Sequence, residues 1–202
     1  MVKVPGFFWR LFPGLVWRIP NHQGKIYLTF DDGPNPSTTE FILDTLDQYN
    51  AKATFFCTGA NAETYPKLYK AILEKGHAVG NHTYHHLSGW QADDESYYDD
   101  VSRCAEVVKS NLFRPPYGQI TLSQIAMLKP LYRIVMWDVM AGDFDEKLRG
   151  EHCFLNVIRS AHEGSIIVFH DSAQAEPRLK HALPRVIEYF SVGGYQFEPI
   201  PA

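Results

Sequence analysis

The hydrophobic pattern of the chain consists of short continuous apolar runs separated by longer segments in which apolar residues recur every three or four positions. Short runs that are rich in β-branched and aromatic residues are typical of buried strands. They occur at residues 25–30 (KIYLTF), 53–57 (ATFFC), 133–137 (RIVMW) and 165–170 (SIIVFH), with shorter candidates at 77–81 and 112–114.

The segments between these runs are expected to be helices. Ser37, with Glu40 three residues later, predicts a capping box at the start of the first helix. Pro66 and Gly76 are expected to begin and end the second helix. Further helices are expected over about 93–110, before residue 133, over about 152–162 and over 176–190. A βα unit repeated about six or seven times predicts an α/β protein, built either as an open doubly wound sheet or as a closed barrel.

Residues 1–24 differ from the rest of the chain because they are rich in aromatic residues and interrupted by prolines (VPGFFWRLFPGLVWRIP). We expect them to form an extension that packs on the barrel, with contact to a membrane surface as the alternative. Residues 25–202 contain no linker, repeat or low-complexity segment and are expected to form one domain.

Composition and charge exclude some classes of partner. Of 202 residues, 45% are hydrophobic and 21% are charged, and the formal net charge is -4. Nucleic acid is not expected as a partner, because phosphate binding normally requires a clustered basic surface. No apolar run is long enough for a transmembrane segment, and the N-terminus does not resemble a secretory signal peptide. We expect a monomer that is cytoplasmic or peripheral at a membrane.

The three cysteines of the chain are far apart and lack CxxC spacing. They are Cys57, Cys104 and Cys153. An odd number of widely separated cysteines favours reduced, buried thiols over a disulfide framework or a zinc knuckle.

Ionisable residues follow most of the predicted strands. They are Asp31, Asp32, His82, Arg114, Asp138, His170 and Asp171. In both candidate architectures, active sites lie at the carboxyl ends of the parallel strands, which together form the rim of the sheet or barrel. The stretch TFDDGP (29–34) could be a solvated turn, because Asp, Gly and Pro are common turn residues. The repeated occurrence of such residues at strand ends favours a functional site instead.

His82 and His86 are four residues apart, which would place both imidazoles on one side of a helical turn. Two histidines and one carboxylate are a ligand set typical of catalytic zinc. Asp31 or Asp32 could supply the carboxylate, and the other could then act as a base. Zn²⁺ is the expected metal, although Co²⁺, Ni²⁺ or Fe²⁺ would suit the same ligands. His85 is expected to have a surface or supporting role.

Five stretches now resemble a known family in order and approximate spacing. They are TFDDGP (29–34), HTYHH (82–86), RPPYG (114–118), WDVMAGDF (137–144) and VFHD (168–171). This set is similar to the five motifs of the NodB-like polysaccharide deacetylases, carbohydrate esterase family 4, and covers residues 25–202. The resemblance implies a distorted, incomplete (β/α) barrel with seven or so strands. It also implies removal of N-acetyl groups from amino sugars, or of O-acetyl groups from xylan.

The resemblance also implies roles for individual residues. Asp31 would be the catalytic base, held by Arg114, and His170 would be the general acid, with Asp143 as its charge partner. Asp32, His82 and His86 would bind the metal. The backbone N–H of Tyr117 would stabilise the oxyanion. Further candidates for contact with the substrate are Pro116, Trp137, Phe144 and Val168.

The chain departs from the family pattern at three positions near the expected pocket. Met140 stands where the fourth motif commonly has Asp, Phe144 where it has Trp, and Val168 where the fifth motif has Leu. The leading prediction is a metal-dependent hydrolase that deacetylates N-acetylated glycans of the peptidoglycan or chitin-oligosaccharide type. The alternatives are a metal-dependent hydrolase of another small amide or ester, and a non-catalytic, metal-stabilised sugar-binding module.

Overall fold

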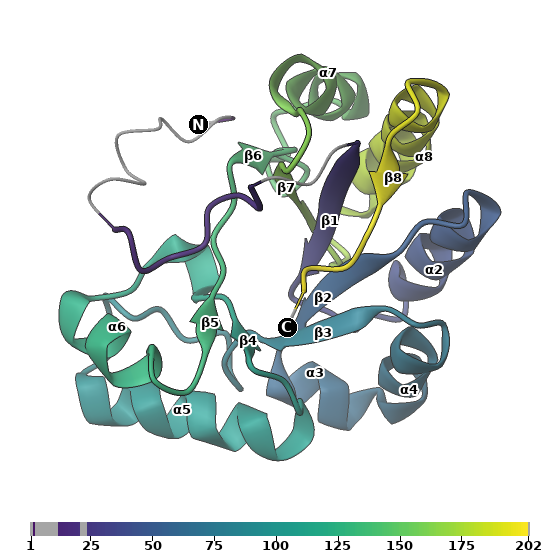
Figure 1. The fold of residues 1–202 in the computed structure, drawn as a ribbon. Helices are drawn as coiled ribbons and strands as arrows, with labels where there is room; N and C mark the ends of the chain where they lie inside the picture. The colour runs from purple at the N-terminus through teal and green to yellow at the C-terminus, as the bar shows by residue number, and fades with distance from the viewer. Residues whose placement is uncertain (1, 3–11, 21–23, 202) are drawn as a thin grey trace.

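The computed structural model describes residue 2, residues 12–20 and residues 24–201. In this part of the chain, parallel strands form a sheet in the order β5-β4-β3-β2-β1-β7-β6, and β8 pairs with β1 beside this path. The strands are β1 (Lys25–Asp31), β2 (Ala53–Cys57), β3 (Ala78–Asn81), β4 (Leu112–Phe113), β5 (Arg133–Ile134), β6 (Val139–Met140), β7 (Ile166–His170) and β8 (Gln196–Phe197). The sheet curls into a half-barrel with β5 and β6 at its two edges (Figure 1). The predicted distorted, incomplete (β/α) barrel is confirmed.

Helices surround the curled sheet on its outer side (Figure 1). They are α2 (Thr39–Gln48), α3 (Gly59–Thr64), α4 (Pro66–Glu74), α5 (Asp94–Val107), α6 (Leu122–Leu128), α7 (Gly150–Ser160) and α8 (Glu176–Val192), with a short 3-10 helix η1 (Pro116–Gly118). The helices expected from hydrophobic spacing are therefore present. Among the residues that the structure describes, none of these helices combines the length and apolarity that a membrane crossing requires.

The alternation of side chains along β1 explains how a buried strand delivers a carboxylate to the barrel interior. Ile26, Leu28 and Phe30 are fully buried against the outer helices. Thr29 and Asp31, which alternate with them, point to the opposite face, where both accept hydrogen bonds from one arginine in the barrel interior. Asp31 is therefore directed inward by the same period-2 pattern that builds the core.

Residues 12–20 run from the β5 edge of the half-barrel to the segment that precedes β7. Val16 pairs in parallel with Val135, and Arg18 pairs in antiparallel with Ser165. Ile19, which is almost fully buried, donates its N–H to the carbonyl of residue 164. Residues 12–20 therefore contact the barrel. Residues 1, 3–11 and 21–23 of the predicted extension lie outside the described residues, and its packing as a whole stays a prediction.

The predicted capping box is wrong. The first helix begins at Thr39, and Thr38 is its N-cap residue, with no side-chain hydrogen bond to the helix. The hydroxyl of Ser37 instead donates to Asn35 Oδ1. The hydroxyls of Thr38 and Thr39 donate to the carboxylate of Asp171. Long-range contacts thus replace the local cap.

Asp138 does not lie on the rim where the strand-end pattern predicted it. Only Arg133–Ile134 of the run RIVMW pairs as β5, and Asp138 precedes β6 beside the amino end of β7. Its two carboxylate oxygens accept hydrogen bonds from Ile166 N (2.8 Å) and Ser165 Oγ (2.9 Å). Asp138 is therefore a buried structural carboxylate on the side of the barrel opposite the rim.

The predicted state of the cysteines is confirmed. Cys57, Cys104 and Cys153 are all free and buried. Burial raises the pKa of each thiol, so the three side chains behave as small apolar groups.

Candidate active site and metal centre

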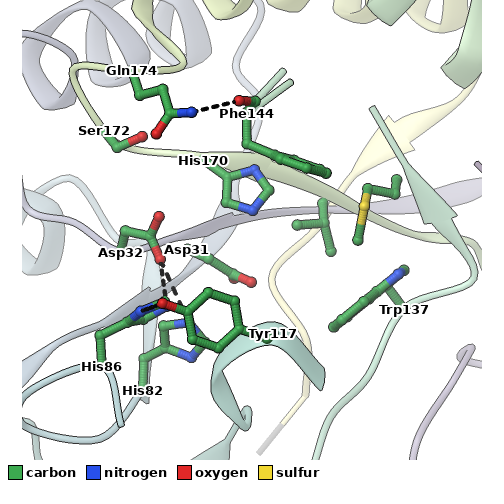
Figure 2. Close-up of a pocket in the computed structure, with 12 residues that line it drawn as sticks. Asp31, Asp32, His82, His86, Tyr117, Trp137, Phe144, His170, Ser172 and Gln174 are labelled. Carbon is green, nitrogen blue, oxygen red and sulfur yellow. Dashed lines mark hydrogen bonds and ion pairs between the residues drawn. The ribbon is translucent and has the colours of Figure 1, made fainter. Parts of the chain in front are cut away.

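A pocket of about 630 Å³ lies at the carboxyl ends of the strands (Figure 2). It is lined by Asp31, Asp32, His82, His86, Tyr117, Trp137, Met140, Phe144, Val168, His170, Ser172 and Gln174. Residues that are up to 143 positions apart in the sequence therefore meet in one cavity, which has a mixed polar and apolar wall suited to a small organic ligand.

Asp31 forms one wall of the pocket and is held from behind by Arg114. Arg114 Nη1 donates to Asp31 Oδ1 at 2.6 Å and to Thr29 Oγ1 at 2.7 Å. Its other guanidinium nitrogens donate to the carbonyls of Val135 and Met136. The arginine side chain is fully buried, so this charge pair is shielded from solvent. Sequence reasoning predicted this pair, and the structure brings the two residues together.

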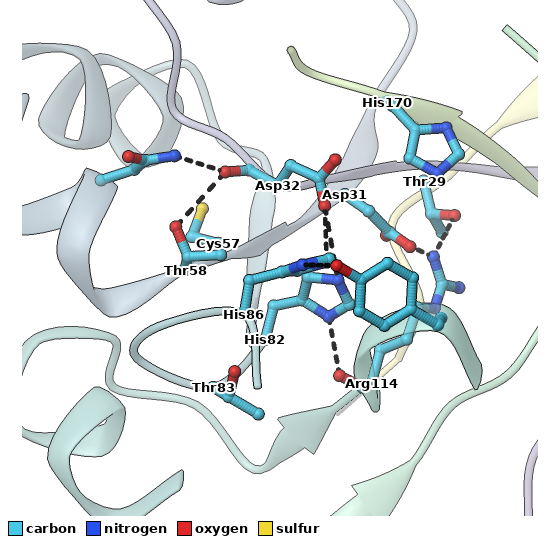
Figure 3. A network of polar contacts seen from close by, with 12 residues as sticks. Thr29, Asp31, Asp32, Cys57, Thr58, His82, Thr83, His86, Arg114 and His170 are labelled. Carbon is cyan, nitrogen blue, oxygen red and sulfur yellow. Dashed lines mark hydrogen bonds and ion pairs between the residues drawn. The ribbon is translucent and has the colours of Figure 1, made fainter. Parts of the chain in front are cut away.

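Asp32 follows the end of β1 and turns its side chain towards the two predicted ligand histidines. Its backbone is left-handed, with φ 79°, a conformation that Asp tolerates better than most residues. The turn is held because the carbonyl of Asp32 accepts hydrogen bonds from Asn61 Nδ2 (2.7 Å) and Thr58 Oγ1 (3.3 Å) (Figure 3). As a result, Asp32 Oδ1 lies 3.6 Å from His82 Nε2 and 3.1 Å from His86 Nε2.

Each of the two histidines is oriented by a contact at its other ring nitrogen. His82 Nδ1 lies 2.7 Å from the carbonyl oxygen of Arg114 (Figure 3), and His86 Nδ1 lies 3.1 Å from the hydroxyl of Tyr117 (Figure 2). A carbonyl can only accept, so Nδ1 of His82 carries a proton, and Nε2, which faces Asp32, is the nitrogen that would bind a cation. This arrangement of supporting contacts is typical of metal-binding histidines.

The predicted helical turn over residues 82–86 is wrong. The two histidines lie on an irregular loop after β3, in which Thr83 and His86 have left-handed backbones (φ 60° and 58°). The convergence of the imidazoles therefore comes from loop geometry and not from the repeat of a helix.

The donor set of Asp32, His82 and His86 fits a divalent cation. One ligand atom from each residue lies within 4.8 Å of the others. Burial alone would raise the pKa of Asp32, but the hydrogen bonds to His82 and His86 and the charge of His170 outweigh it and hold the pKa well below its usual value. Two imidazoles and an ionised carboxylate are the three protein ligands of a typical catalytic zinc site, which keeps a fourth position open.

His170 lies across the pocket from the histidine pair and contacts Asp143. Its Nδ1 is 2.8 Å from Asp143 Oδ1, and its backbone N–H donates to Asp143 Oδ2 at 2.8 Å. Burial alone would lower the pKa of His170, but the charge of Asp143 and this hydrogen bond, with smaller effects of Asp32 and Asp31, raise it to about 9. The imidazole is therefore protonated at neutral pH, and Asp143 itself is fully buried behind it.

The predicted substrate contacts are mostly found at the pocket. Tyr117, Trp137, Phe144 and Val168 line it, whereas Pro116 is buried within η1 and is not one of the lining residues. Tyr117 has a left-handed backbone (φ 58°).

Sequence reasoning missed two polar residues that line the pocket, Ser172 and Gln174 (Figure 2). Gln174 Nε2 donates to the carbonyl of Phe144 at 2.8 Å, which fixes the amide so that its oxygen is free to accept. Both residues lie in the loop that follows β7, two and four positions after its end. This position could have identified them from the sequence, because the loops at the carboxyl ends of barrel strands usually contain active-site residues.

Asp171, the residue that follows β7, supports the TFDDGP turn. It is fully buried and accepts hydrogen bonds from the hydroxyls of Thr38 and Thr39, each at 2.6 Å. Burial, only partly offset by these two hydrogen bonds, raises the pKa of Asp171 to about 7. A Cβ at Gly33 would lie 2.2 Å from Asp171 Oδ2, so this position requires glycine. Asp171 therefore shapes the turn that carries Asp31 and Asp32.

Comparisons with known proteins find similarity to one family. Residues 18–131, more than half of the chain, match the family model described as polysaccharide deacetylase. A peptidoglycan-N-acetylglucosamine deacetylase of Bacillus cereus is 34% identical over 190 residues, which cover 91% of this chain and 89% of the relative. A chitooligosaccharide deacetylase of Azorhizobium caulinodans is 30% identical, with 93% and 98% covered.

The fold is similar to that of solved deacetylases. The crystal structure of the Bc1960 peptidoglycan N-acetylglucosamine deacetylase, in complex with 4-naphthalen-1-yl-N-oxidanyl-benzamide, superposes with a TM-score of 0.90 and 30% identity. The superposition covers 98% of this chain and 95% of that one. With the family model and the two relatives, this similarity shows that the chain belongs to the polysaccharide deacetylase family.

Proposed function

We propose that this protein is a metal-dependent hydrolase that removes acetyl groups from N-acetylated amino sugars in glycans of the peptidoglycan or chitin-oligosaccharide type. The observation that carries the proposal is the meeting, in one pocket, of a three-residue cation site with two separate carboxylate pairs, Asp31 with Arg114 and Asp143 with His170. A sugar-binding module would need neither a buried base nor a protonated imidazole. The names of the relatives support the choice of substrate.

Asp32, His82 and His86 would hold the cation. Zn²⁺ is the expected metal, and Co²⁺, Ni²⁺ or another divalent transition metal would suit the same ligands. When bound, it would polarise the acetamide carbonyl and acidify water, which is the contribution that an unreactive amide requires.

We assign Asp31 as the general base. Arg114 fixes one of its carboxylate oxygens, so the carboxylate faces the pocket in a single orientation and can accept a proton from the attacking water. Because the guanidinium is bound on four sides by Asp31, Thr29 and two backbone carbonyls, the base is held without freedom to rotate.

We assign His170 as the general acid. Asp143 occupies Nδ1 and raises the pKa, so the proton on Nε2 is available at neutral pH to the departing amine. Collapse of a tetrahedral intermediate to a free amine requires this proton, since an amide anion is a poor leaving group.

The backbone N–H of Tyr117 is proposed as the donor that stabilises the oxyanion. The two prolines before it fix the direction of the chain, and the left-handed conformation at Tyr117 turns its peptide unit at the pocket rim. A backbone donor that is already in position stabilises the transition state more than a mobile side chain does, because it need not reorient during the reaction.

Trp137, Phe144 and Val168 are proposed to contact the acetyl group and the sugar, since all three line the pocket beside Met140. Aromatic faces suit the apolar faces of pyranose rings. The volume of about 630 Å³ is in the range of pockets for small ligands, which favours insertion of one sugar unit at a time.

Acetate release tests the proposal. The purified protein, loaded with Zn²⁺, should release acetate from chitooligosaccharides or from peptidoglycan fragments, and Asp31→Asn and His170→Ala should abolish release while the exposed control Asp44→Ala keeps it. Inactivity on every N-acetylated glycan, combined with turnover of a small acetamide or ester, would support the alternative hydrolase instead. Acetylated xylan distinguishes removal of O-acetyl from N-acetyl groups.

Organisation and location are proposals of the same kind. We propose that residues 1–24 form an extension on a deacetylase domain of residues 25–202, and that the protein is monomeric and either cytoplasmic or peripheral at a membrane. Light scattering after size exclusion tests the oligomeric state. Cell fractionation with and without high salt distinguishes the two locations.

A further inference from the structure

The loop that carries the two candidate ligand histidines is not a regular element. Thr83 and His86 both have left-handed backbones, which cost β-branched and other non-glycine residues about 1 kcal/mol or more each. Such a loop keeps its shape only if contacts from elsewhere fix it. The contacts that fix the loop between His82 and His86 include those made by Tyr84 and His85.

Asp100, on α5, binds the middle of this loop with both carboxylate oxygens. Its Oδ2 accepts hydrogen bonds from the backbone N–H groups of Tyr84 and His85, each at 2.9 Å. Its Oδ1 lies 2.5 Å from His85 Nδ1. A single carboxylate thus receives three donors from two consecutive loop residues, and charge-assisted bonds of this kind are stronger than neutral ones.

The burial of Asp100 strengthens its hold on the loop. The residue is 8% exposed, whereas the His85 side chain that meets it is 57% exposed. An inward carboxylate with three donors is costly to rearrange, because any movement of the loop would leave a buried charge without partners. The exposed imidazole adds a contact but is not itself a ligand, since its Nδ1 faces away to Asp100.

Neighbouring contacts fix the first end of the loop to α5 and close the loop on itself. Asn81 Nδ2 donates to the carbonyl of Val101, and Asn81 Oδ1 accepts from the N–H of Thr83 at 2.9 Å. Thr83 Oγ1 accepts from the N–H of Leu87 at 2.9 Å. Between these contacts, the backbone N–H groups of Gly59 and Ala60 donate to the carbonyls of Thr83 and Tyr84. Asp100 binds the N–H groups on the other side of the same peptides, and it is the only charged group that does so among the described residues.

We propose that Asp100 is a positioning residue for the candidate metal site, which holds the loop so that His82 and His86 face Asp32 before a cation binds. This inference rests on the metal site put forward in the proposed function. It assigns a role in metal affinity to a side chain that does not line the pocket. Loss of this carboxylate leaves the ligands in the sequence but removes the preorganisation that makes their affinity high.

The test compares Zn²⁺ binding by metal-free wild type, Asp100→Ala and Asp100→Asn, with Asp99→Ala as the matched control. Asp99 is exposed on the same helix. Competition with a chromophoric chelator gives the dissociation constant, and thermal unfolding of the metal-free proteins gives their stability. We expect Asp100→Ala to bind Zn²⁺ about ten to a hundred times more weakly than wild type. Asp100→Asn, which keeps an acceptor for the two amides, should lose less, and Asp99→Ala should match wild type.

A purely structural role for Asp100 gives a different result. It would lower the unfolding temperature of the metal-free protein and leave the Zn²⁺ dissociation constant of the folded protein unchanged, and that result overturns the proposal. If Asp100→Ala does not fold, the same comparison is made with Asp100→Asn. Failure of wild type to bind Zn²⁺ would overturn the metal site as well, whereas equal affinity of wild type and variant overturns only the role of Asp100.

Discussion

Asp31 and Asp32 are consecutive residues whose side chains reach the same pocket by different backbone routes. Asp31 ends β1 and points into the barrel by strand alternation, where Arg114 holds it at 2.6 Å. Asp32 would point away if the strand continued, but its left-handed backbone (φ 79°) returns its side chain to the rim beside His86. The two carboxylates therefore have different partners, which allows them different roles.

The first prediction concerns this asymmetry. Asp32→Ala removes a proposed ligand and should lose the metal, whereas Asp31→Ala should keep stoichiometric metal and lower turnover by about 10²- to 10⁴-fold, as expected for loss of a general base. Metal content after dialysis, measured by elemental analysis, and acetate release check both. Loss of metal from Asp31→Ala would contradict the assignment.

The second prediction concerns the buried charge of Arg114. Arg114→Met leaves Asp31 as a buried carboxylate without its cation, so the free energy of unfolding should fall by about 3–5 kcal/mol. Urea denaturation measures the change. The double variant Asp31→Asn with Arg114→Met should recover part of the loss, because it no longer buries an unpaired charge. A double variant that is less stable than Arg114→Met alone would contradict this explanation.

The architecture, and most of the residues that line the candidate site, could be predicted from the sequence, because both depend on patterns that lie within short stretches. The apolar runs gave the long strands correctly, since β1, β2 and β7 are buried by their own hydrophobicity. The five motifs identified Asp31, Asp32 and His170, whose positions at strand ends leave few alternative directions for their side chains.

The errors occurred where long-range contacts override a local pattern. HTYHH has helical spacing, but its backbone is fixed by Asp100 from another helix, which spacing cannot reveal. The run RIVMW is apolar after Arg133, yet its middle residue Val135 pairs with Val16 of the N-terminal segment. Asp138 then lies beside the amino end of β7, away from the rim. In both cases the deciding partner is distant in sequence.

The third prediction concerns pH. His170 has a pKa raised from 6.5 to about 9 by Asp143, against the effect of burial. A general acid must be protonated, so the rate should fall as pH rises through about 9. The same pair should stabilise the folded state fully below about pH 6.5, and this contribution should be lost as pH rises towards 9.

Asp143→Asn provides the comparison for this pH dependence. Without the carboxylate, burial acts alone and the alkaline limb of the rate profile should move to lower pH, with a lower maximal rate. Both proteins are measured at the same metal content, so that the charge of the cation affects them equally. Identical alkaline limbs would rule out Asp143 as the partner that sets the pKa of His170.

The fourth prediction separates two roles of Tyr117. Tyr117→Phe removes the hydroxyl that lies 3.1 Å from His86 Nδ1 but keeps the backbone N–H proposed for the oxyanion. Zn²⁺ affinity should fall about tenfold, the lower end of the range for such supporting contacts, because Tyr117 is 65% exposed. Turnover at saturating metal should remain close to that of wild type. A large loss of turnover in fully loaded protein would mean that the hydroxyl itself takes part in the reaction.

The last prediction concerns Asp138, the buried carboxylate on the side of the barrel away from the rim. Burial, only partly offset by hydrogen bonds from Ser165 and Ile166, raises the pKa of Asp138 from 3.8 to about 6. The folded state therefore holds this proton more tightly than the unfolded state, so the contribution of Asp138 to stability falls as pH rises from about 4 to about 6. The difference corresponds to at most about 3 kcal/mol at pH 7.

Asp138→Asn removes this titration while keeping an oxygen that can accept from Ile166. Relative to wild type, the variant should therefore become more stable as pH rises from 4.5 to 7.5, as measured by urea unfolding at a series of pH values. The exposed control Asp44→Asn should follow the wild-type curve closely. Parallel curves for wild type and Asp138→Asn would mean that Asp138 does not bind its proton more tightly in the folded state, because only a raised pKa makes the two curves diverge.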